Sequence, residues 1–404
     1  MTFDDFHFHP DLLDGLYSMG FDQPTPIQEQ AIPLILNGND LIACAQTGTG
    51  KTGAFILPII EKLMQHPAKG INTLVIVPTR ELAVQIDEAI QGFSYYGSVS
   101  AIAIFGGNDG MSFEQEKKAL TQGADIIIAT PGRFISHLNM GYINLSTLQH
   151  LVLDEADRML DMGFSDDLNK IISKLPVKRQ TLLFSATMPP KIRLLCNAIL
   201  NQPKQLSLAI SKPAEGITQQ AYVVYDLQKQ PLLKYILQHS DAKSILIFSG
   251  TKEIVKKLDR ELSEQKFNVA SIHSDLTQDR RNEVMRNFKS RNLRILVATD
   301  ILSRGIDIEN IGIVINYDVP RDAEDYIHRI GRTARAESTG LAITFINEKD
   351  QFRFKKIEDL AGMLVDKMPV PERFGTSPVY NPMAKDISRK KRKPFKKRNN
   401  QPKK

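Results

Sequence analysis

Short runs of aliphatic residues recur along the chain, each followed by a polar or glycine-rich turn and then by a helical pattern. In the first half they occur in DLIACAQTGTGKT, NTLVIVPTREL, VSAIAIFGG, ADIIIATPGR, HLVLDEAD and QTLLFSAT. Runs without polar alternation are typical of strands buried on both faces, as in parallel sheets covered by crossover helices. The pattern therefore predicts an α/β fold.

The same alternation starts again after a break at NQPKQLSLAISKPAEGITQQ, with SILIFSG, NVASIHSD, LRILVATD, IGIVINYD and GLAITFI. Strands that alternate with helices of this length predict parallel sheets with right-handed crossovers. A chain of 404 residues also fits about two domains. We expect an N-terminal domain at 1–205, a linker at 206–217, a C-terminal domain at 218–370 and a tail at 371–404.

Composition narrows the class of protein. A content of 42% hydrophobic and 24% charged residues is typical of a soluble globular protein. No apolar run approaches the ~20 residues that span a bilayer, and MTFDDFHFHP lacks the apolar core of a signal peptide. We therefore expect a cytoplasmic protein without membrane contact. Cys44 and Cys196 are isolated, so we expect packed thiols rather than a disulfide framework or a metal site.

The net charge of +6 is unevenly distributed. Residues 371–404 hold 12 of the 52 Lys and Arg residues but 2 of the 46 Asp and Glu residues, which leaves 40 basic and 44 acidic residues in 1–370. The ending SRKKRKPFKKRNNQPKK has little to bury, so we expect a disordered tail. Such a tail can serve solubility alone, but a run of positive charge also gains affinity for phosphate by releasing counterions. Nucleic acid is the favoured partner.

A candidate phosphate loop, AQTGTGKT, lies between an expected strand and the helical GAFILPIIEKLM. Glycines in such a loop let backbone N–H groups curl around phosphate oxygens, and the following helix adds its positive end. Ala45 stands where the usual pattern has glycine, and an ordinary glycine-rich turn is the alternative for this stretch alone. The residues expected to bind the phosphates, with Lys51 reaching the β- and γ-phosphates, are Thr47, Gly48, Thr49, Gly50, Lys51 and Thr52.

LVLDEADRML places carboxylates directly behind an expected buried strand. Taken alone, they could be the acidic first turn of a helix. With the phosphate loop they gain a second interpretation, because Mg²⁺ held by phosphate oxygens and Thr52 needs an acidic residue on a parallel strand that ends at the same edge. Asp154 is that candidate, and Glu155 could orient and deprotonate the attacking water. The two motifs together predict hydrolysis of a nucleoside triphosphate.

Further motifs occur in both halves of the chain. They are DEAD at 154–157, PTREL at 78–82, GG at 106–107, TPGR at 130–133, SAT at 185–187, LIFSG at 246–250, QDRR at 278–281, ATDILSRGID at 298–307 and HRIGRTAR at 328–335. In this order, from about Phe3 to about Phe345, the chain resembles DEAD-box ATP-dependent RNA helicases of superfamily 2. The resemblance implies two tandem RecA-like domains, each a mostly parallel sheet flanked by helices, plus the disordered basic tail.

The resemblance also assigns the base and the second half of the ATP site. GFDQPTPIQ matches the family's adenine-reading motif, in which Phe21 would stack on the ring and Gln28 would bond its edge. An amide complements adenine N7 and N6 but not guanine, so ATP is favoured over GTP. Phe3 fits the family's upstream aromatic residue, although a core phenylalanine explains it equally well. Arg332 and Arg335 would be arginine fingers from the second domain, worth roughly 10³ to 10⁵ in rate.

The remaining matches concern the ribose, the coupling of the domains and RNA. Asp307 would bind the ribose, Ser185 and Thr187 would bond Asp157, and His328 would face the same junction. Each of these polar residues, taken singly, could instead be a turn or cap residue. Contacts to the sugar–phosphate backbone, which carry no sequence information, are implied for Thr79, Arg80, Gly107, Thr130, Arg133, Gln278, Arg281 and Thr299.

The resemblance therefore implies an RNA-dependent ATPase that uses Mg²⁺ and locally opens short duplexes without translocating far. Its catalytic residues would be Lys51, Asp154, Glu155, Arg332 and Arg335. Two positions depart from the family pattern: Ser303 replaces the usual alanine, and Ala334 replaces a glycine whose backbone could need positive φ. An ATP-regulated RNA clamp or annealing chaperone and a DNA-directed ATPase stay open as alternatives. We expect a monomeric core, and backbone contacts do not name the RNA.

Overall fold

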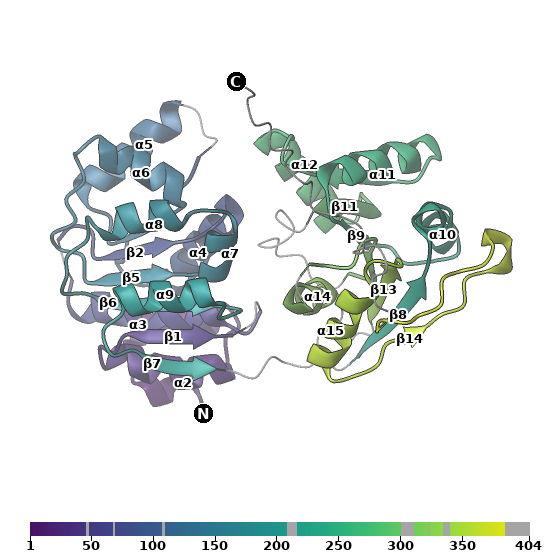
Figure 1. Cartoon of the computed structure of the whole chain (residues 1–404). Helices are drawn as coiled ribbons and strands as arrows, with labels where there is room; N and C mark the ends of the chain where they lie inside the picture. Colours follow the sequence, from purple (N-terminus) through teal and green to yellow (C-terminus); the bar gives the residue numbers. More distant parts are fainter. Residues whose placement is uncertain are drawn as a thin grey trace, which may run out of the picture.

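The computed structural model describes residues 1–45, 48–67, 69–106, 110–207, 216–299, 311–321, 323–333 and 340–383. Two α/β domains follow one another, the first drawn in purple to teal and the second in green to yellow (Figure 1). Among the described residues, no helix combines the length and apolar composition needed to cross a bilayer.

The first domain contains seven strands and nine α-helices in the described residues. They are η1 (Phe3–Phe6), α1 (Pro10–Ser18), α2 (Pro26–Leu36), β1 (Leu41–Cys44), α3 (Lys51–Gln65), β2 (Thr73–Ile76), α4 (Arg80–Phe93), β3 (Ala101–Ile104), α5 (Gly110–Gln122), β4 (Ile126–Ala129), α6 (Pro131–Asn139), β5 (His150–Leu153), α7 (Ala156–Asp161), α8 (Ser165–Ile172), β6 (Gln180–Ser185), α9 (Pro190–Ile199) and β7 (Lys204–Ser207).

The second domain repeats this plan. Its elements are β8 (Ile217–Val223), α10 (Asp226–Gln238), β9 (Ile245–Ser249), α11 (Lys252–Glu264), β10 (Val269–Ile272), α12 (Gln278–Lys289), β11 (Ile295–Thr299), β12 (Ile313–Asn316), α14 (Ala323–Ile330), β13 (Gly340–Ile346), α15 (Gln351–Ala361), β14 (Asp366–Lys367) and η2 (Glu372–Phe374).

Each domain is built on one seven-stranded parallel sheet. The strand orders are β3-β4-β2-β5-β6-β1-β7 and β10-β11-β9-β12-β13-β8-β14. Counted from the first strand of each domain, both orders read 3-4-2-5-6-1-7. Since every strand of a parallel sheet points the same way, all loops that follow strands meet at one edge, where ligands bind in such folds. The expected architecture of two tandem domains, each a parallel sheet flanked by helices, is confirmed.

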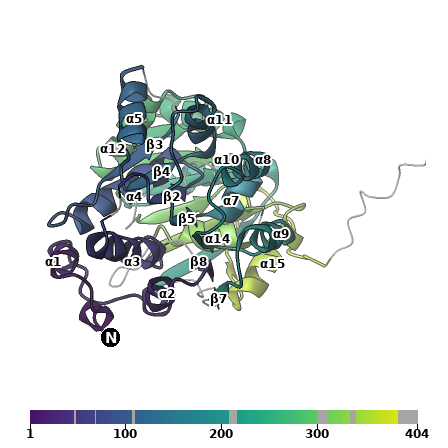
Figure 2. The same ribbon diagram turned by 90° about the vertical axis from the view of Figure 1, so that its left-hand side faces the viewer.

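Helices cover both faces of the first sheet. One core lies between the sheet and helices α1 to α4, and a second lies between the sheet and helices α6 to α9. Figure 2 shows α1, α3 and α4 on one side and α7, α8 and α9 on the other. Phe3 is fully buried in the first core, its ring centroid 6.2 Å from that of Phe6, so it has the core position that the sequence left open. Double coverage explains why β2, β4 and β5 are uninterrupted aliphatic runs.

The same helix position is used differently in the two domains. In the first, six residues separate β1 from α3, whereas Val224 and Tyr225 alone connect β8 to α10. Lys229, in the first turn of α10, is buried and lies 2.9 Å from a carboxylate oxygen of Asp318, which follows β12. The second domain therefore has a tight turn and an internal ion pair where the first has its phosphate loop.

The domain boundaries differ from the expected ones. β7 extends to Ser207 and β8 begins at Ile217, so the expected linker at 206–217 contains strand residues at both ends. Residues 208–215 lie outside the described part of the chain.

The expected disordered tail at 371–404 is wrong for its first part. Residues 371–383, here called the C-terminal strap, are ordered on the second domain. The side-chain amides of Gln228 and Gln351 donate hydrogen bonds to backbone carbonyls of the strap, at 2.8 to 3.0 Å. Tyr380 packs against the core formed by α14 and α15. Composition missed these contacts because two glutamines and a few aromatic contacts hold a segment that has few hydrophobic residues. The rest of the tail lies outside the described residues.

We predict that His150→Gln makes the free energy of unfolding less sensitive to acid. His150 is buried at the start of β5, 3.0 Å from Asn72 Oδ1, and burial lowers its pKa from 6.5 to about 3. Such a histidine contributes stability above its unfolded pKa and loses it as the pH falls towards 3. Between pH 7.5 and 5 the wild type should lose about 2 kcal/mol more than the variant in urea unfolding. Equal losses would contradict the prediction.

Candidate ATP site and RNA-facing residues

The phosphate loop adopts the backbone that its glycines permit. Gly48 and Gly50 have φ of 81° and 90°, in the left-handed region that glycine adopts without strain. A Cβ on Gly50 would lie 2.6 Å from Thr25 Oγ1, so a larger residue would also clash there. Lys51, the first residue of α3, is buried and its ammonium donates to the Ala45 carbonyl at 2.9 Å. Thr49 and Thr52 are partly exposed beside it, and Thr47 lies outside the described residues.

The residues expected to bind adenine adjoin this loop. Gln28 is buried on α2, and its Oε1 accepts from the Thr25 amide at 2.9 Å. Its Nε2 donates to the Gly50 carbonyl at 3.0 Å, a contact that the motif pattern did not predict. Phe21 is partly buried, with its ring edge against Phe93 at a centroid distance of 5.3 Å. The base-reading motif and the phosphate loop are thus in direct contact.

The acidic residues follow β5, which is separated from β1 by β6. Asp154 is almost fully buried and accepts a hydrogen bond from the Glu155 amide at 2.9 Å. Burial raises the pKa of Asp154 to about 6, against the opposing influence of the Lys51 ammonium. A cation at this carboxylate would offset its desolvation. Asp154 and the Thr52 hydroxyl are oxygen donors of the kind Mg²⁺ prefers, so these residues fit the metal.

Glu155 has a strained backbone and a buried partner. Its φ of 50° and ψ of 48° are left-handed, which is uncommon for a residue other than glycine. Its carboxylate accepts from Arg158 Nη1 at 2.8 Å, with side-chain exposures of 10% and 5% for Glu155 and Arg158. Sequence reasoning missed Arg158, although two residues three apart at the start of a helix are neighbours. The arginine fixes the direction of the carboxylate.

The expected coupling residues of the first domain form one hydrogen-bonded unit. Asp157 Oδ2 accepts from the amide and the hydroxyl of Thr187, both at 3.0 Å. The Asp157 amide donates to Ser185 Oγ at 3.3 Å, and that hydroxyl donates to the Thr187 carbonyl at 2.7 Å. The loop after β6 is thereby tied to the first turn of α7, the helix that also carries Arg158.

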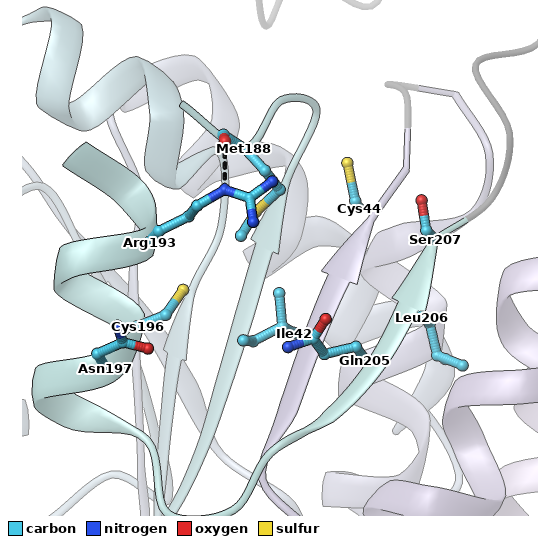
Figure 3. Close-up of a pocket in the computed structure, with 9 residues that line it drawn as sticks. All are labelled: Ile42, Cys44, Met188, Arg193, Cys196, Asn197, Gln205, Leu206 and Ser207. Carbon is cyan, nitrogen blue, oxygen red and sulfur yellow. Dashed lines mark hydrogen bonds between the residues drawn. The ribbon is translucent and has the colours of Figure 1, made fainter. Parts of the chain in front are cut away.

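A separate cavity of ≈370 Å³ lies on the other side of the β1 strand end, beside β7 and α9 (Figure 3). Its wall includes both cysteines: Cys44 Sγ donates to the Ala186 carbonyl at 3.3 Å, and burial raises the pKa of Cys196. Neither cysteine forms a disulfide in the described part of the chain. None of the residues expected to bind ATP lines this cavity, whose lining is Ile42, Cys44, Met188, Arg193, Cys196, Asn197, Gln205, Leu206 and Ser207.

Comparison with known proteins decides the family. The DEAD/DEAH box helicase model matches residues 25–195, and the helicase conserved C-terminal domain model matches residues 228–337. Over 372 residues the chain is 39% identical to the DEAD-box ATP-dependent RNA helicase CshA of Bacillus subtilis, covering 92% of this chain and 74% of that relative. The chain belongs to the DEAD-box family of ATP-dependent RNA helicases. It is an ATP-hydrolysing enzyme.

Two solved structures extend the comparison. S. cerevisiae Dbp5 bound to RNA and ADP BeF3 has a TM-score of 0.81 at 30% identity, covering 91% of this chain and 95% of that chain. A DEAD box protein from the hyperthermophile Methanococcus jannaschii has a TM-score of 0.53 at 36% identity, covering 91% of this chain and 99% of that chain. The fold similarity therefore includes both domains.

The DEAD-box positions expected to face RNA in the first domain are strand ends and helix starts. Thr79 accepts from the Leu82 amide at 3.4 Å as the N-cap of α4. The Arg80 guanidinium lies over the Phe105 ring at 4.4 Å. Thr130 precedes α6, and Arg133 in its first turn is paired with a buried glutamate. Gly107 lies outside the described residues.

In the second domain, Thr299 ends β11 and Arg281 Nη2 donates to the Ser274 carbonyl at 3.0 Å. Gln278 begins α12, but its side chain is not described. His328 and Arg332 lie on and just after α14, both partly exposed. The neighbouring Arg329 is instead buried and bonds Asn316 Oδ1 at 2.9 Å, as a structural residue. Asp307 and Arg335, and the departures at Ser303 and Ala334, lie outside the described residues.

We predict that Asp154→Asn stabilises the nucleotide-free protein while removing ATP turnover. The pKa of Asp154 is about 6 in the folded protein and 3.8 in the unfolded chain. Its ionisation therefore costs no stability below pH 3.8 and lowers the free energy of unfolding by the full amount above pH 6. In EDTA at pH 7.5, urea unfolding should show a gain of about 1–3 kcal/mol.

The matched control for this prediction is Asp157→Asn in the same motif. That change removes an acceptor from the Thr187 contacts and should lower the free energy of unfolding. An Asp154→Asn protein no more stable than the wild type at pH 7.5 would refute the role of burial.

Proposed function

We propose that this helicase opens short RNA duplexes locally and without long translocation, by binding the backbone of one strand across both domains. The observation that carries the proposal is the likeness of the two-domain chain to a structure bound to RNA. At the same 91% coverage, the TM-score is 0.81 against Dbp5 bound to RNA and ADP BeF3 but 0.53 against the M. jannaschii protein, although the latter is more similar in sequence. Likeness to an RNA- and nucleotide-bound relative supports a site completed by both domains.

ATP would bind by exchanging internal contacts for its own. Lys51 would leave the Ala45 carbonyl for phosphate oxygens, which also meet the amides of the loop and the start of α3. Gln28 would leave the Gly50 carbonyl for the adenine edge, with Phe21 against the ring. Because Gln28 contacts Gly50, binding of the base would directly change a hydrogen bond of the phosphate loop.

Hydrolysis needs a metal, a water and positive charge on the γ-phosphate. Thr52 and Asp154 would hold Mg²⁺, which neutralises charge that develops on the phosphate oxygens. Glu155, fixed by Arg158, would orient the attacking water. Arg332 and Arg335 would supply the γ-phosphate contacts from the second domain.

RNA would close the site by binding both domains at once. Arg80 would bind the RNA backbone from the first domain and Arg281 from the second. The hydrogen-bonded residues Asp157 and Thr187, facing His328, would couple domain closure to the acidic motif. Backbone contacts give affinity without reading sequence. The proposal includes a monomeric core acting in the cytoplasm.

We predict that single-stranded RNA raises ATP turnover and that DNA of the same sequence does so far less. Glu155→Gln should lower RNA-stimulated turnover by at least about 100-fold while ATP-dependent RNA binding persists. Phosphate release and RNA anisotropy measure the two effects.

These assays separate the alternatives. Equal turnover with RNA, DNA and neither would refute RNA coupling, and equal stimulation by DNA would favour a DNA-directed ATPase. A wild type that anneals RNA strands but does not separate them would favour an annealing chaperone. Full turnover in Glu155→Gln would remove that residue from its role.

We predict that deletion of residues 384–404 weakens RNA binding mostly at low salt, because the deleted segment carries much of the excess positive charge. The slope of log affinity against log salt should fall by about 0.7 for each phosphate of a single strand that the tail neutralises in the wild type. The C-terminal strap is retained, so the free energy of unfolding should not change. An unchanged salt slope would indicate that the tail serves solubility and does not bind RNA phosphates.

A further inference from the structure

A buried polar cluster joins α5 to α6 in the first domain and includes Arg133, which is expected to contact RNA. Glu116 of α5 is 3% exposed, and its Oε2 accepts from Arg133 Nε at 2.7 Å and from the His137 ring at 2.8 Å. Arg133 Nη2 lies 2.7 Å from the same oxygen. The His137 ring stacks on Phe113 at 4.6 Å, and its other nitrogen contacts the Tyr142 hydroxyl.

This cluster fixes the direction of the Arg133 guanidinium. Nε donates to Glu116, Nη2 lies beside the same oxygen without a hydrogen-bond partner among the described residues, and the Phe113 ring covers the guanidinium at 4.8 Å. An arginine fork has five N–H donors in a rigid plane, so holding one edge leaves the Nη1 edge for a second partner. The Arg133 side chain is 17% exposed, whereas that of Glu116 is 4% exposed. Of these two residues, the arginine is the one that reaches the surface.

The cluster also contains unpaired polar atoms. Glu116 Oε1 and Arg133 Nη2 are both buried and have no hydrogen-bond partner among the described residues. A buried carboxylate in this state holds its cationic partner firmly, because removal of Arg133 would leave the carboxylate with His137 alone. The guanidinium is therefore held in place before any ligand arrives.

We propose that Glu116 is a positioning residue for RNA binding, which aims the free edge of Arg133 at a backbone phosphate. The inference rests on the proposed function, in which Arg133 contacts RNA, and adds the residue that makes this contact effective. Glu116 lies 17 positions from Arg133, on a different helix. Its sequence position gives no sign of this role.

The direction of the change in RNA affinity on removing Glu116 distinguishes a positioning role from a simple effect of its charge. Removing an acidic residue near a phosphate-binding surface should strengthen RNA binding if long-range charge alone matters. Removing Glu116 should weaken it if the guanidinium is no longer held in one direction. Glu114 supplies the matched control, since it is exposed on the same helix and carries the same charge.

The test compares full-length Glu116→Gln and Glu114→Gln with the wild type, using a labelled single-stranded RNA and a non-hydrolysable ATP analogue over a range of salt. We expect Glu116→Gln to weaken RNA binding roughly tenfold, as for one hydrogen bond to a charged group. The log–log salt slope should fall by about 0.7. Glu114→Gln should bind RNA as tightly as the wild type or more tightly, and the KM for ATP should stay unchanged in both.

Arg133→Gln should reproduce the weaker binding, and the double variant Glu116→Gln with Arg133→Gln should bind no more weakly than either single variant. Arg133→Lys keeps the charge but cannot span both partners, so it should also bind weakly. Urea unfolding identifies conditions in which every variant is folded, and RNA binding is compared there. Glu116→Gln binding as tightly as Glu114→Gln, or Arg133→Gln binding like the wild type, would overturn the proposal. A wild type that does not bind RNA would instead refute the proposed function.

Discussion

The candidate ATP site depends on one constraint. Its charged side chains are buried, away from water, at the carboxyl edge of the first sheet. Lys51, Asp154 and Glu155 are all buried, and each has found an internal partner: the Ala45 carbonyl, the Glu155 amide and Arg158. Groups fixed in a desolvated site act more strongly on a ligand than the same groups in water, which would offset the loss of the internal contacts that ATP replaces. Burial thus links the fold of the sheet to its chemistry.

The first turn of helix α7 carries two neighbouring residues that each hold another part of the candidate site. Asp157 holds the loop after β6, while Arg158, the next residue, holds the carboxylate of Glu155. A displacement of Thr187 would therefore act on the residue expected to orient water through the first turn of this helix. A short rigid element is suited to this role because its backbone hydrogen bonds move it as a unit.

The features that the sequence revealed were local ones. Uninterrupted aliphatic runs identified β2, β4 and β5, because a strand covered on both faces has no polar alternation. Glycines at fixed spacing indicated the backbone of the loop between β1 and α3, because Gly48 and Gly50 adopt positive φ there. In both cases the cause and the signal lie within a few neighbouring residues.

The features that the sequence did not reveal depend on contacts between distant segments. Gln28 bonds Gly50, and Glu116 bonds Arg133, although polar residues on helices are usually solvated. The C-terminal strap looked like the start of a charged tail, yet Gln228 and Gln351 satisfy its backbone. The pairing of a buried amide or carboxylate is decided by tertiary geometry, which composition and periodicity do not contain.

The repeated strand order has a consequence for stoichiometry. Both sheets are wound identically, but the turn at Val224 and Tyr225 is too short to wrap a triphosphate, and Lys229 is already neutralised by Asp318. Among the described residues, the turn after the first strand of the second sheet therefore offers no counterpart of the loop between β1 and α3. We expect one ATP per chain, with the first lobe holding its phosphates and the second lobe adding contacts to them.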